Sequence, residues 1–361
     1  MKPSIIPIFI PHQGCPHQCV FCNQKTITGH NTIPAPEEIN ELITSYKKIH
    51  PYKEFHLAFY GGSFTGVPHK VQEGFLRLAS QALRDREIKS IRVSTRPDYI
   101  TRDKLLLLKK YGVGVVELGV QSMVDEVLSL SNRGHTSSDT FYAIELLKNM
   151  GFKIGIQFMP GLPGDTQDSI FYTVKQIIKF CPDFVRIYPT VVLKDTPLAD
   201  IYFQRKYTPL TLLEAIKICE YIYLAFLYND INVIRMGLQA NDYLACRDNI
   251  IAGPYHPAFK YLVETNLAYK MMEQLIKKIP SFHQRVHNFE ANETFVANLY
   301  GHKKINIELL KKRHNLADVM IKINNDLKRD QLGFRDNSNS YREINYKRLY
   351  ELLYLSPVKF R

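Results

Sequence analysis

A repeated alternation of short apolar runs with longer amphipathic segments constrains the fold of this chain more than any other feature. Such alternation is typical of βα units and a parallel sheet. The predicted strands are Ile5–Ile10, Glu54–Tyr60, Ser90–Thr95, Val115–Gly119, Lys153–Met159, Phe184–Thr190 and, as a seventh candidate, Ile231–Met236. The predicted helices are Pro36–Lys48, Lys70–Arg84, Arg102–Lys110, Asp139–Met150, Thr166–Phe180 and Leu210–Leu227. We therefore expect an α/β fold, a partial (β/α)6 barrel short of the eight units of a complete one.

Three prolines indicate which strand lies at an edge of this sheet. Pro3, Pro7 and Pro11 lie in and around the first predicted strand. A proline has no N–H to donate to a neighbouring strand, so it is tolerated at an edge. The first strand is therefore predicted to be the open edge. Ligands of parallel α/β folds bind at the carboxyl ends of the strands, so we look for site residues in the loops that follow them.

Composition limits the class of protein. With 45% hydrophobic and 23% charged residues, the 361-residue chain is expected to fold as one large domain and a smaller one, which excludes disorder, collagen-like repeats and coiled coil. The N-terminus lacks a small-residue cleavage site, and no apolar run reaches the length of a membrane span. We expect a cytoplasmic protein, away from membranes, with reduced cysteines.

The pattern changes after residue 253 to helices and short polar segments without further βα units. This predicts a barrel domain over residues 1–252 and a small C-terminal domain, α/β or α-rich, over residues 253–361. Lys260–Arg361 contains 19 Lys and Arg against 11 Asp and Glu, which accounts for +8 of the chain's net charge of +12. A basic domain favours a polyanionic partner such as RNA.

A cysteine triplet directly follows the first predicted strand. Residues 14–22, GCPHQCVFC, place Cys15, Cys19 and Cys22 at CxxxCxxC spacing in a loop. Three thiolates from one short loop can bind three irons of a [4Fe–4S] cluster and leave the fourth iron open. The remaining cysteines are widely separated and offer no clear fourth ligand: Cys181, Cys219 and Cys246.

A structural zinc site is the alternative for the same thiols. The three cysteines could be joined by a nearby histidine, namely His12, His17 or His30. Zinc sites usually combine two paired half-sites, and this sequence has no second half. The spacing and the strand–loop context therefore favour the cluster.

The triplet resembles the hallmark of the radical S-adenosylmethionine (radical SAM) enzymes, whose fold is a partial TIM-like barrel. In these enzymes S-adenosylmethionine (SAM) chelates the open iron, and one electron from the cluster cleaves it to a 5′-deoxyadenosyl radical. The resemblance implies that Cys15, Cys19 and Cys22 are the cluster ligands and catalytic residues, and that Phe21 lies near the adenine. It also implies an electron donor such as ferredoxin or flavodoxin.

Motifs after later strands resemble the rest of the SAM site. Gly61, Gly62 and Ser63 resemble the glycine motif that binds the methionine amino group, although a plain tight turn is the alternative. Adjacent glycines let a backbone approach a ligand closely.

Polar residues at three strand ends complete this resemblance. Gln121 and Arg133 are similar to a pair that contacts the ribose and the methionine carboxylate in oxygen-independent coproporphyrinogen oxidases. An arginine suits a carboxylate through its bidentate fork, and a surface arginine at a helix end is the alternative for Arg133. The resemblance places Gln157 and Ser94 near the nucleoside.

Longer strings are similar to the catalytic subunit of the Elongator complex, which modifies the wobble uridine of transfer RNA (tRNA). They are STRPDY at 94–99, VELGVQS at 116–122 and NRGHT at 132–136. The cysteine spacing is shorter than in that subunit, and no acetyl-coenzyme A loop occurs, so we expect no acetyltransferase domain. The resemblance implies radical chemistry on a tRNA base, with SAM and a [4Fe–4S] cluster as cofactors.

Two features bear on the substrate. Residues 301–304, GHKK, are similar to the Gly-x-x-Gly loop of KH RNA-binding modules, and a solvated basic helix is the alternative. Arg186 and Tyr188 on the sixth strand face either the substrate or the core. The alternative functions are a radical SAM enzyme for a small molecule, similar to coproporphyrinogen oxidase, and a non-catalytic zinc RNA-binding protein.

Overall fold

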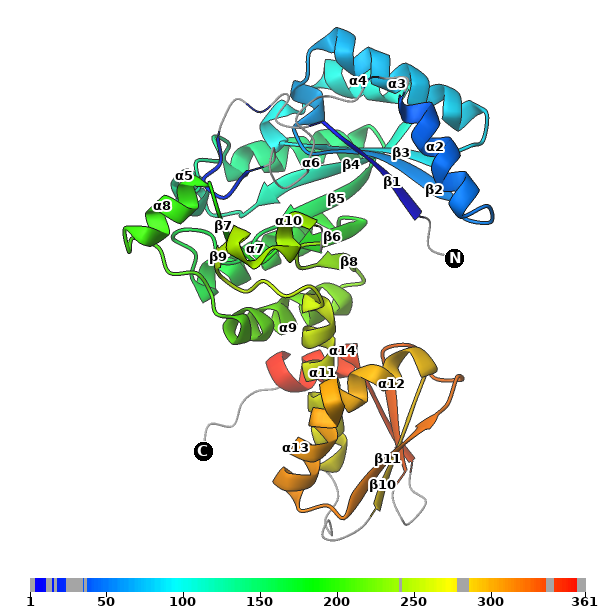
Figure 1. Cartoon of the computed structure of the whole chain (residues 1–361), viewed down its shortest axis with the longest axis vertical. Coiled ribbons are helices and arrows are strands. Elements are labelled where there is room, and N and C mark those ends of the chain that lie inside the picture. Colours follow the sequence, from blue (N-terminus) through cyan, green and yellow to red (C-terminus); the bar gives the residue numbers. More distant parts are fainter. Residues whose placement is uncertain are drawn as a thin grey trace. The chain divides into compact units, whose positions relative to one another are not determined.

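Seven parallel strands form the main sheet of the computed structural model (Figure 1). They are β1 (Ser4–Phe9), β2 (Phe55–Tyr60), β3 (Ser90–Thr95), β4 (Val113–Gln121), β5 (Lys153–Phe158), β6 (Phe184–Ile187) and β8 (Asn232–Met236). Their order is β1-β2-β3-β4-β5-β6-β8, with every neighbouring pair parallel. This half-barrel confirms the predicted fold, the edge position of the first strand and the seventh candidate strand.

The structure describes residues 4–10, 15, 18–23, 35, 38–239, 242–277, 286–335 and 341–355. The chain folds into two compact units. The barrel unit comprises Met1–Leu212 and Ile231–Pro257, and the second unit comprises Leu213–Asp230 and Ala258–Arg361. The predicted domain boundary between residues 252 and 253 stays a prediction. No described helix is long and apolar enough to span a membrane.

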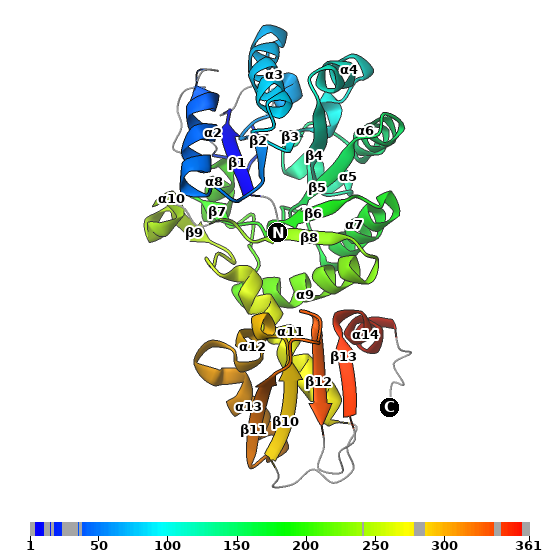
Figure 2. The same cartoon turned by 90° about the vertical axis from the view of Figure 1, so that its right-hand side faces the viewer.

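Helices cover the outer, convex side of the half-barrel (Figure 2). They are α2 (Glu38–Ile49), α3 (His69–Arg84), α4 (Arg102–Lys110), α6 (Ser137–Asn149) and α7 (Gln167–Phe180). Thr136 and Thr166 begin α6 and α7 with capping boxes, in which each threonine hydroxyl accepts a hydrogen bond from a backbone N–H of the first turn. The predicted helices are thus confirmed to within a few residues.

Short elements of the barrel unit escaped the sequence analysis. They are α5 (Asp125–Leu130), α8 (Pro197–Phe203), α10 (Asp242–Ala245) and the antiparallel pair β7 (Val192–Leu193) and β9 (Ile250–Ala252). A helix of two turns or fewer shows too little of its 3.6-residue period to be found by pattern.

The second unit combines a four-stranded sheet with helices. The sheet order is β11-β10-β12-β13, made of β10 (Val286–Ala291), β11 (Asp318–Ile323), β12 (Gln331–Arg335) and β13 (Tyr341–Asn345). The helices are α9 (Leu212–Tyr228), α11 (Phe259–Ile276), α12 (Glu293–Tyr300), α13 (Ile305–His314) and α14 (Tyr346–Tyr350).

This unit contains a parallel crossover, so the prediction of no further βα units after residue 253 is wrong. β10 and β11 pair in parallel, and α12 and α13 connect them. Polar residues interrupt the apolar pattern of both strands, VHNFEA and DVMIKI, which hides them from a periodicity analysis. The α/β form of the predicted C-terminal extension is the one observed.

Candidate functional site

Backbone and side-chain hydrogen bonds attach the cysteine loop to two distant segments. The Val20 N–H donates to the Ser131 carbonyl at 3.1 Å, and the Leu198 N–H donates to the Val20 carbonyl at 2.8 Å. The Asn132 amide donates to the Gln18 carbonyl at 2.8 Å. Val20 is also buried in an apolar cluster that contains Leu198. The loop after β1 is therefore held by the segment after β4 and by the start of α8.

The thiols of this loop lie among hydrogen-bond donors and positive charge. The Arg133 Nη1 donates to the Cys19 Sγ at 3.1 Å, and Cys19 is buried. Burial raises the pKa of the Cys15 thiol, while a bond from the Ser63 N–H and the charges of Arg96 and Arg133 act to lower it. Burial outweighs these effects, so the pKa of Cys15 is raised overall, and the donors and cations would stabilise thiolates that bind iron.

Arg133 and Gln121 meet above a glycine at the end of β4. Arg133 is buried, and its Nη2 donates to the Gly119 carbonyl at 2.7 Å, so the surface alternative for this arginine is wrong. A Cβ at Gly119 would lie 3.1 Å from the Gln121 Nε2 and 3.4 Å from the Arg133 Nη2. Gly119 thus leaves space for both side chains. Gln121 itself takes a left-handed φ of 66°, which is uncommon outside glycine and concentrates at functional sites.

Several buried polar atoms of this group have no partner within the described part of the chain. They are the Arg133 Nε, the Gln121 Oε1 and the Arg96 Nη1. A buried unpaired donor or acceptor costs about 1–3 kcal/mol, so such atoms gathered in one place indicate a binding site for a polar ligand.

The glycine motif after β2 brings two loops together. Gly61 has φ +100°, and a Cβ there would lie 3.2–3.4 Å from the backbone of Ile10. The half-buried Gly62 follows it. The Ser63 hydroxyl bonds to the Thr95 hydroxyl at 2.8 Å and accepts from the Arg96 N–H at 3.2 Å. The motif therefore joins the ends of β1, β2 and β3 beside Cys15.

Gln157 and Ser94 meet on the inner face of the sheet. The Gln157 Nε2 donates to the Ser94 hydroxyl at 3.2 Å, which links β5 to β3 past β4. Phe21 lies beside Arg133, whose guanidinium is 6.0 Å from its ring centre. Every predicted SAM-site residue therefore lies at or near the carboxyl ends of β1 to β5. Their individual roles stay predictions.

Arg96 and His135 belong to this site and were not identified from the sequence. The Arg96 guanidinium forms a bidentate pair with Asp98, with both contacts at 2.9 Å. Burial acts to lower the pKa of Arg96, but Asp98 raises it above its usual value, so the cation persists beside the cysteines. Burial, with the charges of Arg133 and Arg96, lowers the pKa of His135 to about 3, so its ring is neutral. Arg96 lies within the string STRPDY and His135 within NRGHT, and the resemblance of these strings to the Elongator subunit could have identified both residues.

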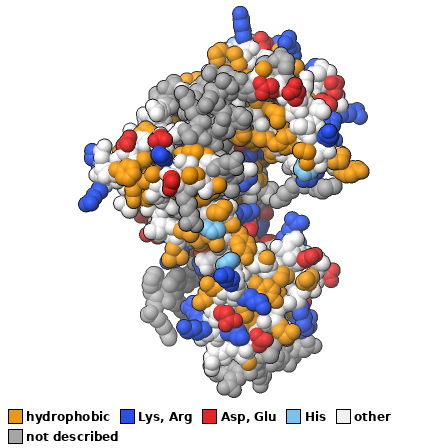
Figure 3. Space-filling view, viewed as in Figure 1, with side chains coloured by type: hydrophobic (Ala, Val, Ile, Leu, Met, Phe, Trp, Pro, Cys, Tyr) orange, Lys and Arg blue, Asp and Glu red, His pale blue; other side chains and the backbone are white. Residues whose placement is uncertain are grey.

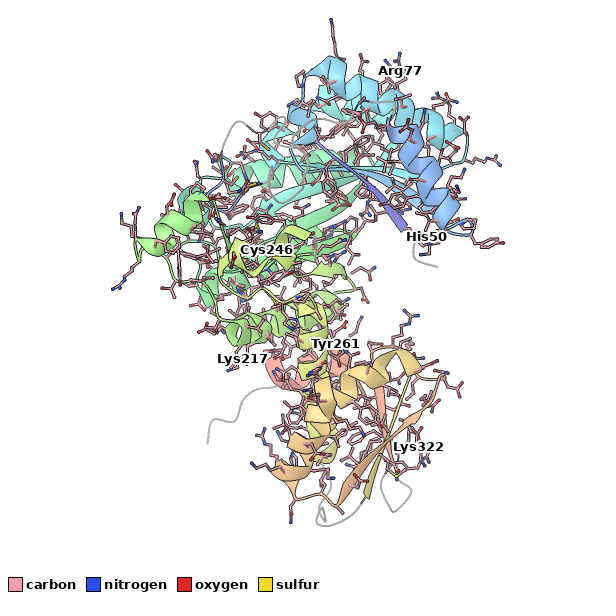
Figure 4. The ribbon with its side chains drawn as sticks, viewed as in Figure 1. His50, Arg77, Lys217, Cys246, Tyr261 and Lys322 are labelled. Carbon is pink, nitrogen blue, oxygen red and sulfur yellow. The ribbon has the colours of Figure 1, made fainter. Side chains whose placement is uncertain are left out.

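Of the residues in the zinc alternative, the structure describes the three cysteines. His12, His17 and His30 lie outside the described residues. Within the described ranges no three His, Cys, Asp or Glu side chains are grouped to hold a single metal ion. Three cluster cysteines each bind a different iron, so they need not surround one ion. Of the other cysteines, Cys219 is buried, while Cys181 and Cys246 are exposed, the latter directly after α10 (Figure 4).

Two sequence profiles match consecutive stretches that contain this site. The profile of the radical SAM superfamily matches residues 9–177, and the profile of the radical SAM C-terminal domain matches residues 182–269. This chain belongs to the radical SAM superfamily of enzymes.

In sequence, the chain is similar to Elongator-type proteins. A tRNA uridine(34) acetyltransferase of Methanocaldococcus infernus is 28% identical over 259 residues, which is 60% of this chain and 48% of that protein. Elongator complex protein 3 of Mus musculus is 30% identical over 184 residues, 43% of this chain and 33% of that protein. The solved structure of the Methanocaldococcus infernus Elp3 with an N-terminal deletion is 25% identical, with a TM-score of 0.59 over 75% of this chain and 63% of that chain. The chain spans about half the length of the curated relatives it matches.

The described residues fit the two cofactors that the superfamily implies. SAM carries amino, carboxylate and ribose groups that need donors and acceptors. The Arg133 Nε and the Gln121 Oε1 are buried beside the cysteine loop and have no partner among the residues that the structure describes. A [4Fe–4S] cluster needs thiolates, and Cys15 and Cys19 are surrounded by Arg133, Arg96 and the Ser63 N–H. Cys15, Cys19 and Cys22 would hold the cluster.

Proposed function

We propose that this radical SAM enzyme modifies a uridine of tRNA. The observation that carries the substrate class is the similarity of this chain to proteins named as tRNA uridine(34) acetyltransferases. The donor-rich site beside the cysteine loop supports the radical part of the proposal. The match covers 48% of one such protein, so the proposal is limited to the radical chemistry and its tRNA substrate.

The bound cofactors supply the chemistry, in which one electron cleaves SAM to a 5′-deoxyadenosyl radical. The protein binds and orients them. In this proposal Arg133 and Gln121 hold polar groups of SAM, and the glycine motif after β2, whose Ser63 is hydrogen-bonded to Cys15, binds its amino group. The neutral His135 and the cationic Arg96 set the charge behind the thiolates.

The radical part is tested with the full chain, reconstituted with iron and sulfide under anaerobic conditions. SAM and dithionite, in place of the electron donor, should yield 5′-deoxyadenosine. The Cys19→Ala variant should lose the brown cluster and this product, while Cys246→Ala, an exposed cysteine outside the loop, should keep both. Failure of the wild type to form 5′-deoxyadenosine would contradict the radical assignment.

The substrate part needs tRNA from cells that lack this protein. The holoenzyme with SAM and reductant should convert one uridine to a new nucleoside, detected by mass spectrometry of digested tRNA. A wild-type enzyme that cleaves SAM but leaves all nucleosides unchanged, and instead converts a small molecule, would favour the coproporphyrinogen oxidase-like alternative.

We further propose that the second unit contacts RNA through a basic turn. Gly301, Lys303 and Lys304 have left-handed φ values of 69°, 51° and 64°, and the turn leads from α12 into α13. Among the described residues no ion pair is formed by Lys303, Lys304 or Lys312. Figure 3 shows Lys and Arg side chains on this unit with acidic ones between them. Unpaired cations on a turn are suited to phosphate oxygens.

A salt titration checks this contact. For the variant Lys303→Glu/Lys304→Glu, tRNA binding should weaken. The negative slope of log K against log salt should become shallower by about 2. Lys217→Glu on α9, an exposed lysine of the same unit, should leave the slope close to that of the wild type (Figure 4). Equal slopes for the double variant and the wild type would contradict the proposal.

A further inference from the structure

A buried carboxylate organises the inner face of the half-barrel beneath the cofactor site. Glu117 on β4 is fully buried. Its Oε2 lies 2.8 Å from the Arg186 Nε, and its Oε1 lies 3.2 Å from the Arg92 Nη2. Gly155 on the next strand leaves space for this carboxylate, because a Cβ there would lie 3.0 Å from the Glu117 Cγ.

Arg186 extends from this carboxylate across the concave side of the sheet. Its Nη2 donates to the Tyr60 hydroxyl at 2.7 Å. Tyr60 ends β2 and Arg186 is on β6, and three strands, β3, β4 and β5, lie between them in the sheet. The bond therefore spans the interior of the half-barrel, and together with Glu117 it fixes the guanidinium in one orientation.

The two tyrosines bound to Arg186 differ in whether their hydroxyl groups donate a hydrogen bond to a neighbouring side chain. The Tyr60 hydroxyl donates to the Glu117 Oε1 at 3.1 Å. The Tyr188 oxygen accepts from the Arg186 Nη1 at 3.3 Å. Its own hydrogen must point away from the guanidinium, and among the described residues it meets no acceptor. Tyr188 is half-buried just after β6, so part of its side chain is open to solvent.

The charge around Tyr188 favours an oxygen acceptor. Two arginines share one carboxylate, which leaves one positive charge in excess, and the Arg92 Nε is buried without a partner in the part of the chain that the structure describes. A cation on the phenol oxygen strengthens the phenol as a donor. One free O–H suits a single carbonyl oxygen, whereas a phosphate would bring three oxygens that need donors.

We propose that Tyr188 donates a hydrogen bond to a ring carbonyl oxygen of the substrate base, with Arg186 as the residue that positions it. The inference rests on the proposed function, because a uracil ring offers two such carbonyls. Tyr188 would orient the base below the cofactor, and Glu117 would keep Arg186 in place.

The test uses the reconstituted full chain with SAM, dithionite and tRNA from cells that lack the protein. Tyr188→Phe removes a single oxygen. It should form 5′-deoxyadenosine at the wild-type rate without tRNA and bind tRNA with the same salt dependence. Its yield of modified nucleoside should fall about tenfold to hundredfold. Tyr142→Phe, an exposed tyrosine on α6, is the matched control and should behave as the wild type.

A second variant tests the role of Arg186. Arg186→Lys keeps a cation opposite Glu117 but loses the Nη1 donor to Tyr188. It should lower the yield as Tyr188→Phe does, and the double variant should show little further loss, because both changes remove one interaction. A fully multiplicative loss in the double variant would overturn the positioning role.

The outcomes separate this inference from the function on which it rests. If the wild type modifies tRNA and Tyr188→Phe modifies it equally well, the inference alone is wrong. If the wild type cleaves SAM but modifies no nucleoside, the proposed function fails and the inference fails with it. A selective loss of modification in Tyr188→Phe, with SAM cleavage and tRNA binding kept, supports both.

Discussion

Single side chains at this site connect parts of the chain that are far apart in sequence. Arg133 follows β4, yet it reaches the Cys19 thiol, 114 residues earlier, and the Gly119 carbonyl. The same guanidinium also keeps one nitrogen, Nε, free of partners within the described residues. One residue thus stabilises the cysteine loop and presents a donor to a ligand.

Replacing Arg133 by alanine should weaken SAM binding more than cluster binding. A charge-assisted hydrogen bond contributes about 1.5–3 kcal/mol, so we expect the Kd for SAM to rise roughly tenfold to 150-fold, measured by equilibrium dialysis of the reconstituted enzyme. Iron content should fall less, because Arg133 is not one of the three proposed cluster ligands. Arg102→Ala, an exposed arginine at the start of α4, is the control. An unchanged Kd would show that Arg133 does not bind SAM.

Gly155 is a second position where the addition of one side-chain atom should affect stability. A Cβ there would lie 2.3 Å from the Phe184 ring and 3.0 Å from the Glu117 Cγ. Overpacking of this kind costs about 1–3 kcal/mol, and Gly155→Ala should lower the free energy of unfolding in urea by that amount. Gly114→Ala on β4, where the nearest atom is at 3.4 Å, should cost clearly less. Equal losses in the free energy of unfolding would mean that the close contacts of Gly155 do not cause its sensitivity to substitution.

Among the elements, the turn between β5 and α7 shows how a loop at the carboxyl end of a strand is stabilised. The Asp165 carboxylate accepts from the Gly161 N–H at 3.0 Å and from the Ser169 hydroxyl. Burial raises the pKa of Asp165 to about 6, and these hydrogen bonds only partly offset the shift. The folded turn is therefore more stable with a protonated Asp165 than with a charged one.

This preference predicts a pH dependence of stability. Because the folded pKa is raised, the contribution of Asp165 is fully present below about pH 4 and is lost as the pH rises through about 6. Between these values the free energy of unfolding of the wild type should fall by on the order of 2–3 kcal/mol relative to that of Asp165→Asn, which does not titrate. Urea unfolding of both proteins at pH 4, 5, 6 and 7 measures the difference. Parallel curves would contradict the shifted pKa.

At the level of the whole molecule, the second unit is assembled from two separate stretches of chain. α9 precedes β8 in sequence but groups with the residues after Ala258. The buried Glu220 of α9 contacts Asn266 and Lys270 of α11. Burial raises the pKa of Glu220, and the charge of Lys270 opposes this shift. A polar contact between α9 and α11 therefore joins the two stretches.

Removal of this carboxylate should destabilise the second unit. Glu220→Ala leaves Asn266 and the partly exposed Lys270 without their acceptor, and we expect a loss of about 2 kcal/mol in the free energy of unfolding, followed by circular dichroism in urea. Glu308→Ala, an exposed carboxylate on α13 of the same unit, should change it little. A similar effect of both changes would argue against a specific role for the buried pair.

Local patterns in the amino-acid sequence were sufficient to predict the seven strands of the main sheet, the helices α2, α3, α4, α6, α7 and α9, and the edge position of β1, because periodicity and spacing are properties of neighbouring residues. The contacts of Arg133 with Cys19 and of Tyr60 with Arg186 were not predictable in this way, since they join residues 114 and 126 positions apart. They depend on the order of strands and on the curvature of the sheet, which brings side chains of β2 and β6 together across the inner face. The parallel pairing of β10 and β11 was missed for the same reason: each strand is too polar to be recognised alone, and it is their partners in the sheet that stabilise them.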